Sequence, residues 1–257
     1  MYNLPSPLLA VLVTAVAFLY ASVGFGGASG YLAVMSQFGI DPAIMASTAL
    51  ILNIVVASIA FINYTRAGAL RRDLLLPFLL TSVPAAFLGG YFKLQADVYL
   101  LLLYAVLTYV MLRMLFARPE PQTGTEDLHS FPLWLALTCG AGIGLLSGMV
   151  GIGGGIFLSP LIILARWGTP KQAAATAAGF IVLNSISGLL GRALGGNFVL
   201  GAFGAALLPL GIIGALAGSY LGARKFSGLW TRRILGVVLL IAIVNFWVGY
   251  LGGNNAR

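Results

Sequence analysis

The chain has 257 residues, of which 60% are hydrophobic and 8% charged, with a formal net charge of +8 at pH 7. Soluble domains carry about 25% charged residues, so this composition excludes an ordinary soluble protein and indicates an integral membrane protein. The basic residues lie between apolar runs, which is typical of topology signals and not of a nucleic-acid-binding surface. Runs such as 100–103 and 237–241 do not alternate, so we expect helices and not barrel strands.

Ten apolar segments divide the sequence. Most are long enough to cross a bilayer, which takes roughly 20 helical residues. The second and the seventh have only about 11–13 residues and look like re-entrant or broken helices. The ten segments lie near 5–23, 28–38, 43–63, 74–92, 98–116, 132–150, 154–166, 171–192, 198–222 and 230–250.

A glycine cluster stands directly before each short segment, at 24–30 and at 148–155. Glycine weakens a helix and permits backbone conformations that other residues avoid. Irregular backbone at membrane depth occurs only where protein or a water-filled cavity surrounds it. Paired breaks at corresponding places are a pointer to a transporter's binding site. The alternative is that these glycines only let helices cross closely.

The two halves repeat the same order of features. After each short segment the chain turns at a Gly…Pro sequence, from Gly39 to Pro42 in the first half and from Gly168 to Pro170 in the second. A stretch of small residues follows each turn, with 46–48 matching 174–176. We therefore predict a first transmembrane repeat over 1–117, a linker over 118–131 and a second repeat over 132–257.

The basic residues choose between two topologies. If each glycine-broken pair forms a hairpin, most of them share one side, and the other side keeps Lys93, Arg192 and Arg257. If each pair forms one crossing, the basic residues divide evenly between the two sides of the membrane. The positive-inside rule favours the hairpin, with a cytoplasmic linker and inverted halves. The prediction is an all-α polytopic membrane protein of two inverted repeats, each with a re-entrant pair plus three spanning helices, about 8–10 membrane segments.

This repeated pattern resembles the sulfite exporter TauE/SafE family over nearly the whole chain, and the match is especially close at 145–155. The resemblance implies a bacterial inner-membrane, multi-pass transporter of sulfite, sulfonates or related organic anions, with a probable exporting direction. The family often has Gly-Thr-Ser after the turn, whereas this chain has 46–48 and 175–177, and the second stretch lacks one hydroxyl. The two halves of the site are therefore not expected to be strictly equivalent.

The candidate binding residues are the glycine breaks and polar groups inside the apolar runs. Freed N–H groups at 27–30 and 154–157 would form a partly positive concavity for an anion. Among the polar groups, Asn53, Ser58, Ser185 and Ser187 are expected to pack between helices instead. The candidate substrate-binding set is Gly26, Gly27, Ala28, Ser29, Ser47, Thr48, Gly153, Gly154, Gly155, Thr176 and Asn184.

The charged residues near the apolar segments are few, and their expected roles are limited. Arg192 could draw an anion toward an external mouth, but snorkelling to the interface is the expected role. All six acids fall outside or at the edges of the apolar cores, so no intramembrane carboxylate serves catalysis or a proton relay. We expect no enzyme, no cofactor, no metal and no nucleic-acid partner, but a small anionic substrate and a lipid bilayer. The alternative is a passive anion channel. An intramembrane enzyme would need carboxylates or histidines that the spans lack, and the paired breaks argue against a ligand-free assembly subunit. The oligomeric state stays open, and a homodimer is one alternative.

Overall fold

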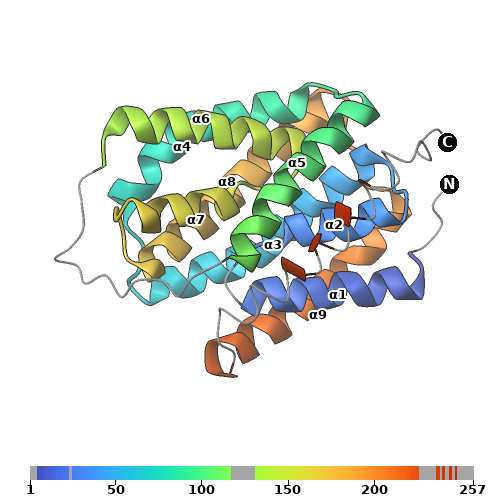
Figure 1. The fold of residues 1–257 in the computed structure, drawn as a ribbon, viewed down its shortest axis with the longest axis horizontal. Helices are drawn as coiled ribbons and strands as arrows, with labels where there is room; N and C mark the ends of the chain where they lie inside the picture. Colours follow the sequence, from blue (N-terminus) through green and yellow to red (C-terminus); the bar gives the residue numbers. More distant parts are fainter. Residues whose placement is uncertain are drawn as a thin grey trace.

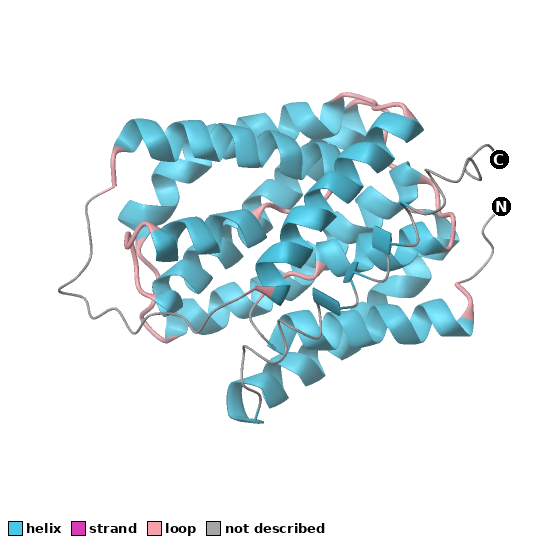
Figure 2. Ribbon diagram, viewed as in Figure 1, coloured by secondary structure: helices cyan, strands magenta, loops and turns pink. Residues whose placement is uncertain are grey.

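The structure is a computed structural model that describes residues 5–22, 25–116 and 131–225, together with 236, 237, 239, 240, 243, 244 and 247. Within this part of the chain the regular structure is helical, and short connections join the helices (Figure 2). Most of the predicted linker over 118–131 and most of the tenth segment over 230–250 lie outside the described residues.

The described helices follow the first nine predicted segments. Six of them are long and apolar enough to cross a membrane, and Gly155–Leu164 is a shorter apolar helix. The prediction of an all-α polytopic membrane protein is therefore confirmed. In chain order the helices are α1 (Pro7–Ser22), α2 (Ala28–Gln37), α3 (Pro42–Arg66), α4 (Arg72–Tyr91), α5 (Ala96–Leu115), α6 (Leu133–Val150), α7 (Gly155–Leu164), α8 (Pro170–Leu194) and α9 (Gly201–Lys225).

Helices α3 and α8 begin in the same way and have the same length, 25 residues. Each has proline in its first turn, where a missing N–H costs nothing. The Asp41 side chain accepts a hydrogen bond from Ala43 N and caps α3, while Thr169 and Gln172 form a capping box at the start of α8. The Gly…Pro turns therefore set the start of α3 and α8.

Packing partners are exchanged between the two halves. Helix α1 packs on α9 as α6 packs on α4, and α2 packs on α3 as α7 packs on α8. Helices α3 and α8 pack against each other, and α4 lies against both α6 and α8 (Figure 1). In a two-fold repeat, each contact between helices must have a counterpart made by the equivalent helices, and these pairs meet that condition. The inverted repeat is still a prediction, and the equal helix lengths and exchanged partners support it.

Several glycines act in helix packing. A Cβ at Gly144 or Gly148 of α6 would collide with the carbonyl oxygens of Ser82 and Ala86 on α4. At Gly214 and Gly218 of α9 it would collide with the carbonyls of residues 14 and 18 on α1. Small residues at such spacing let membrane helices approach backbone to backbone. Close packing, the alternative role of glycine, therefore applies along these two seams.

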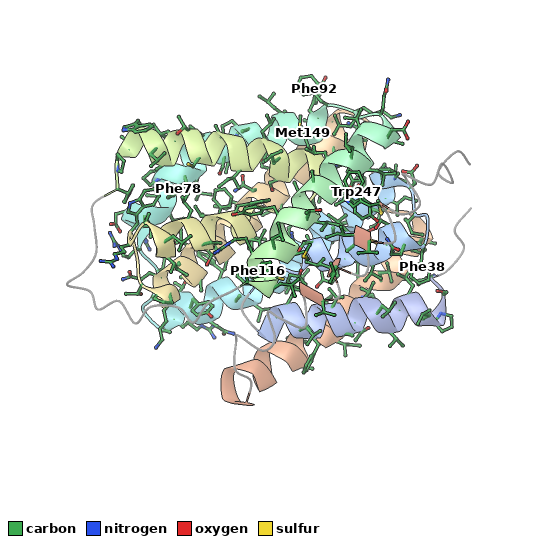
Figure 3. The ribbon with its side chains drawn as sticks, in the orientation of Figure 1. Phe38, Phe78, Phe92, Phe116, Met149 and Trp247 are labelled. Carbon is green, nitrogen blue, oxygen red and sulfur yellow. The ribbon has the colours of Figure 1, made fainter. Side chains whose placement is uncertain are left out.

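Helix α7 packs on α8 and runs back toward the end of the bundle where α6 begins (Figure 1). Phe131, just before α6, and Trp167, just after α7, have ring centroids 6.0 Å apart. Phe78 of α4 packs on both rings, at 6.4 and 6.2 Å (Figure 3). Arg71 Nη1 donates to the carbonyl of Trp167 at 3.1 Å. The start of α6, the end of α7 and the start of α4 therefore meet at one end of the bundle, as the hairpin topology requires.

Candidate functional site

The two glycine breaks end in the same local conformation. Gly27 and Gly154 stand at the N-caps of α2 and α7 with φ of 92° and 79°, in the left-handed region that favours glycine. Gly151 and Gly153 in the second break also have positive φ, 89° and 80°. Conformational freedom of the backbone is therefore a requirement at the breaks, in contrast to the packing glycines of α6 and α9.

Both short helices start without a side-chain cap. The first hydrogen bonds inside them run from Gly30 N to Gly27 O and from Phe157 N to Gly154 O, each 3.0 Å long. The first-turn N–H groups that precede these bonds are left without a capping side chain. Such a helix start carries partial positive charge and is suited to an anion.

The breaks meet around two side chains from the middle of the long helices, Asn53 of α3 and Ile181 of α8. A Cβ on Gly153 would lie 2.6 Å from Asn53 Nδ2 and 3.0 Å from Ile181 Cγ2. A Cβ on Gly26 would collide with Asn53 Oδ1 and lie 3.2 Å from Ile181 Cγ2. Gly155 also abuts Ile181. The predicted residue Gly26 is thus brought together with Gly153 and Gly155, although it lies 127 or more positions before them in the chain.

Asn53 links the breaks chemically. Its side chain is fully buried, and Nδ2 donates to the carbonyl of Ile152 in the second break at 3.0 Å. Its Oδ1 has no hydrogen-bond partner. A cavity of about 10 Å³ is lined by Gly26 and Ile152, which contact Asn53, and by Ile181, although Asn53 itself does not line it. That is space for about one water, so the structure is closed around Asn53.

The predicted polar residues do not all face this point. Ser29 shares a 2.7 Å hydrogen bond with Tyr20, and Ser47 Oγ accepts from Val199 N at 3.3 Å. Thr48 Oγ1 lies 2.6 Å from the place of a Cβ on Gly204, so it faces α9. Thr176 and Asn184 are fully buried on α8, and their side-chain oxygens have no partner.

Sequence reasoning placed Asn53 and Ser185 among the packing residues. Asn53 does hydrogen-bond across helices, but it also stands where both breaks meet. Ser185 Oγ lies 3.0 Å from the place of a Cβ on Gly153 and has no partner. A signal was present in the sequence, because Asn53 and Ile181 occupy matching positions. Each lies 11 residues after the proline that starts its helix, Pro42 or Pro170.

Arg192 corrects a second expectation. Its exposed fraction is 6%, so it does not snorkel to an interface. Its Nη2 donates to the carbonyls of Met149 and Gly148 at 2.7 and 3.3 Å, at the end of α6. The described acids agree with expectation, because Asp41, Asp73 and Asp97 all stand at helix starts.

Comparisons with known proteins agree with this architecture. The profile of the family described as "Sulfite exporter TauE/SafE" matches residues 8–246. The probable membrane transporter protein y4hK of Sinorhizobium fredii is 35% identical over 239 residues, which cover 91% of this chain and 95% of that protein. The probable membrane transporter protein YunE of Bacillus subtilis is 28% identical over 125 residues, covering 49% and 44% of the two chains.

A third relative, the probable membrane transporter protein MJ0441 of Methanocaldococcus jannaschii, is 44% identical over 54 residues, 21% of this chain and 20% of that protein. No solved structure matches. The channel alternative finds no support in these comparisons, since each relative is described as a transporter. With six candidate spans and a family match over nearly its whole length, the chain is a multi-pass membrane transporter protein of the sulfite exporter TauE/SafE family.

Proposed function

We propose that this protein is a secondary transporter of small anions, with sulfite and small sulfonates as its first candidate substrates and export as its direction. The observation that carries the proposal is the convergence of the two glycine breaks on Asn53. Gly26 and Gly153, the residues just before the two uncapped helix starts, adjoin one buried neutral amide. Helix N-termini favour negative charge without a titratable group, so the arrangement suits an oxyanion.

The charges of the described residues support an anion over a cation. Asp41, Asp73 and Asp97 stand at helix starts, and none of them lines the small cavity at the breaks. A cation buried at mid-membrane would need a carboxylate or a cage of carbonyl groups to offset its desolvation. The buried, unpartnered hydroxyl groups of Thr176 and Ser185 can instead donate to substrate oxygens.

The closed centre supports transport by conformational change. A cavity of about 10 Å³ is too small for an oxyanion, so substrate binding requires α2 or α7 to move away from Asn53. Movement of one repeat against the other around a central site is the mechanism of many transporters with internal repeats. The matched break conformations at Gly27 and Gly154 give each repeat an equivalent point of movement.

The family description is the support for sulfur-containing anions and for export. Direction depends on gradients as well as on the protein, so it is tested with purified protein in proteoliposomes. Vesicles loaded with radiolabelled sulfite, sulfate or methanesulfonate should release the preferred anion faster than empty-membrane controls, with saturation. Vesicles loaded with sodium or tetramethylammonium should not. Saturable cation movement without any anion movement would refute the proposal.

Asn53→Asp provides a sharp companion variant. A carboxylate at the point where the breaks meet would repel an anion at close range, so anion movement should fall by at least about tenfold. Ser58→Ala is the matched control, because Ser58 Oγ donates to Ile54 O in its own helix at 2.5 Å. Unchanged anion transport by Asn53→Asp would exclude the breaks as the binding site.

A further inference from the structure

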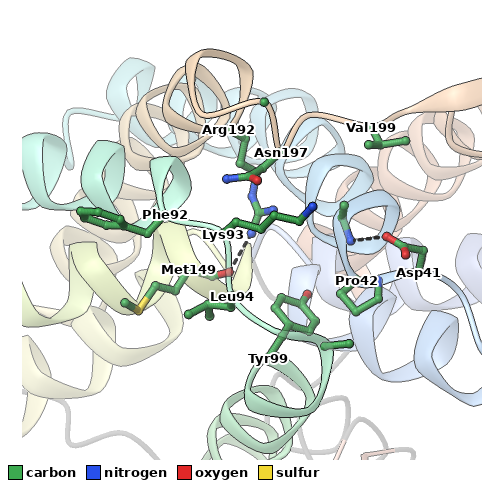
Figure 4. A pocket seen from close by; sticks show the side chains of 13 residues that line it. Asp41, Pro42, Phe92, Lys93, Leu94, Tyr99, Met149, Arg192, Asn197 and Val199 are labelled. Carbon is green, nitrogen blue, oxygen red and sulfur yellow. Dashed lines mark hydrogen bonds between the residues drawn. The ribbon is translucent and has the colours of Figure 1, made fainter.

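A second cavity lies at the opposite end of the bundle from the Phe131–Trp167 contact. Its volume is about 310 Å³, and it opens where α3 and α5 begin and where α4, α6 and α8 end (Figure 4). None of its lining residues lines the small cavity beside Asn53. The polar side chains in its wall are Asp41, Lys93, Tyr99, Arg192 and Asn197.

Arg192 is the buried charge of this cavity. Its Nη2 donates to two carbonyls at the end of α6, while Nε has no hydrogen-bond partner. In the described part of the chain the ion pair is Arg71–Asp73, and no carboxylate pairs with Arg192. A buried guanidinium without a counter-charge is costly, because carbonyl oxygens replace only part of its hydration. An anion in the cavity would supply the missing charge.

The remaining groups set the charge of the cavity wall. Lys93 adds a second positive charge, and its side chain extends across the opening (Figure 4). Asp41 opposes them, but its Oδ1 accepts from Ala43 N at 2.8 Å and caps α3. Asn197 Nδ2 donates to the carbonyls of residues 90 and 91, and its Oδ1 is unpartnered. Two positive charges against one negative charge leave the wall with one net positive charge, which suits a small monoanion such as a sulfonate.

We propose that this cavity is a second anion-binding site, a vestibule that holds a small oxyanion at Arg192 and Lys93 between the glycine breaks and the outer surface of the membrane. The cavity is large enough for a sulfonate, whereas the space beside Asn53 in this closed structure is not. The proposal goes beyond the central site, since it concerns different residues at the membrane edge.

The geometry also links the vestibule to the second break. Arg192 holds the carbonyls of Gly148 and Met149, and Tyr99 Oη donates to the carbonyl of Val150 at 3.0 Å. These three carbonyls come directly before Gly151, where the backbone turns left-handed. An anion at Arg192 would compete with them for the guanidinium, so vestibule occupancy would loosen the end of α6 next to the break.

The test measures the electrostatics and the occupancy of the vestibule in purified full-length protein. Cys139 is replaced by serine, and a single cysteine is placed at Ala96, which lines the cavity. An anionic methanethiosulfonate should react with it roughly threefold to tenfold faster than a cationic reagent of similar size. A cysteine at Ala67, in the exposed turn after α3 and next to Arg66, is the control for occupancy, because an anion bound in the vestibule should not slow its modification.

Charge variants should shift the ratio of anionic to cationic reaction rates in both directions. Lys93→Gln should lower the ratio of anionic to cationic rates at position 96. Asp41→Asn should raise it, because asparagine retains the helix cap and removes the opposing charge. Millimolar methanesulfonate, which does not react with these reagents, should slow modification with saturation. Arg192→Gln should abolish that protection, and Arg192→Lys should keep the rate ratio but weaken the protection because lysine lacks the planar fork.

The variant Gly153→Ala distinguishes anion binding in the vestibule from anion binding at the glycine breaks. That variant should stop transport while methanesulfonate still protects position 96. Equal rates for the two reagents, or protection that survives Arg192→Gln, would overturn the vestibule. Loss of protection in Gly153→Ala would overturn its independence from the breaks. Failure of anion transport in wild-type protein, with protection intact, would refute only the proposed function.

Discussion

Asn53 and Ile181 occupy the same position in two helices of equal length, and both glycine breaks contact both residues. Exchange of Gly26 with Gly153 and of Asn53 with Ile181 leaves this set of contacts unchanged. These contacts are the ones expected at the centre of the predicted two-fold repeat, with one polar side chain that breaks the symmetry. Asn53 gives this point its hydrogen-bonding groups.

The first prediction tests this relationship by moving the amide. Asn53→Ile should reduce anion transport by at least about tenfold, because it removes a buried donor and acceptor and leaves the Ile152 carbonyl unpaired. The double variant Asn53→Ile with Ile181→Asn returns one amide to the equivalent position. We expect it to transport clearly more than Asn53→Ile alone in the same proteoliposome assay. Equal loss in both variants would show that the two positions are not equivalent.

The second prediction separates space from backbone conformation at the breaks. Gly26→Ala adds only a Cβ against Asn53, while Gly153→Ala adds a Cβ and also strains a residue with φ of 80°. Both should lose transport, and Gly153→Ala should also unfold more easily, by roughly 1–3 kcal/mol.

Gly142→Ala is the matched control for these variants. Position 142 lies in α6, and a Cβ there would meet nothing within 4 Å. Alanine is the better helix former, so stability should stay equal or rise by about 0.5–1 kcal/mol with transport intact. Uptake and thermal unfolding in detergent measure the two properties. Normal transport by Gly26→Ala would contradict a tightly filled centre.

Segment length and glycine clusters were sufficient to predict the helices of the described part. Span length follows from bilayer thickness, and the starts of α3 and α8 follow from proline and capping side chains. The glycine clusters also located the breaks, because polar or strained backbone in an apolar run needs a structural reason. These signals are local in the chain, so a single sequence was sufficient to predict the helices and the breaks.

The side chains that meet at the centre depended on information that is not local. Ala46, Thr48 and Asn53 all lie on α3, but Ala46 faces Gly151, Thr48 faces Gly204 and Asn53 faces Gly153. Rotation of a helix about its axis is set by its neighbours, and α3 is apolar or small on every side. A weak hydrophobic pattern could not show that Asn53, and not Thr48, points toward the breaks.

The third prediction concerns the seam between α4 and α6. Gly148→Ala would push its Cβ into the carbonyl of Ala86, which belongs to the backbone and cannot rotate away. The two helices would have to separate, and the protein should lose roughly 1–3 kcal/mol of stability. Thermal unfolding of the detergent-solubilised protein measures this loss, with Gly142→Ala on the same helix as the control. Unchanged stability would mean that the seam is looser than the structure indicates.

The fourth prediction addresses sidedness. Ala96 and the end that carries Lys93 should face outward, and Gln122 in the linker should be cytoplasmic, because most basic residues are predicted on the linker side. Single cysteines at Ala96, Gln122 and Asn254 in a Cys139→Ser background are treated with an impermeant reagent on intact cells. Positions 96 and 254 should react, and position 122 should react only after lysis. The reverse pattern would invert the topology.

The last prediction uses the hydroxyl of Thr176, whose oxygen is fully buried and has no partner. An unsatisfied buried polar group costs roughly 1–3 kcal/mol, so the nearly isosteric change Thr176→Val should leave stability equal or higher. If the hydroxyl serves the anion, the same change should weaken anion binding by roughly 0.5–3 kcal/mol. Thr48 Oγ1 is also buried and unpartnered, so Thr48→Val should likewise leave stability equal or higher, but its effect on anion affinity should be smaller because Thr48 faces Gly204 of α9.

Thr108→Val is the control, because Thr108 Oγ1 already donates to Tyr104 O in its own helix at 2.7 Å. It should leave anion affinity unchanged. Saturation of anion release from proteoliposomes and thermal unfolding without substrate give the two readouts for each variant. If the hydroxyl serves packing, its removal should lower the stability of the protein without changing anion affinity. If the hydroxyl binds substrate, its removal should lower anion affinity without lowering stability. Thr176→Val with lower stability and normal affinity would remove Thr176 from the candidate site, since its hydroxyl would then have an undetected structural partner.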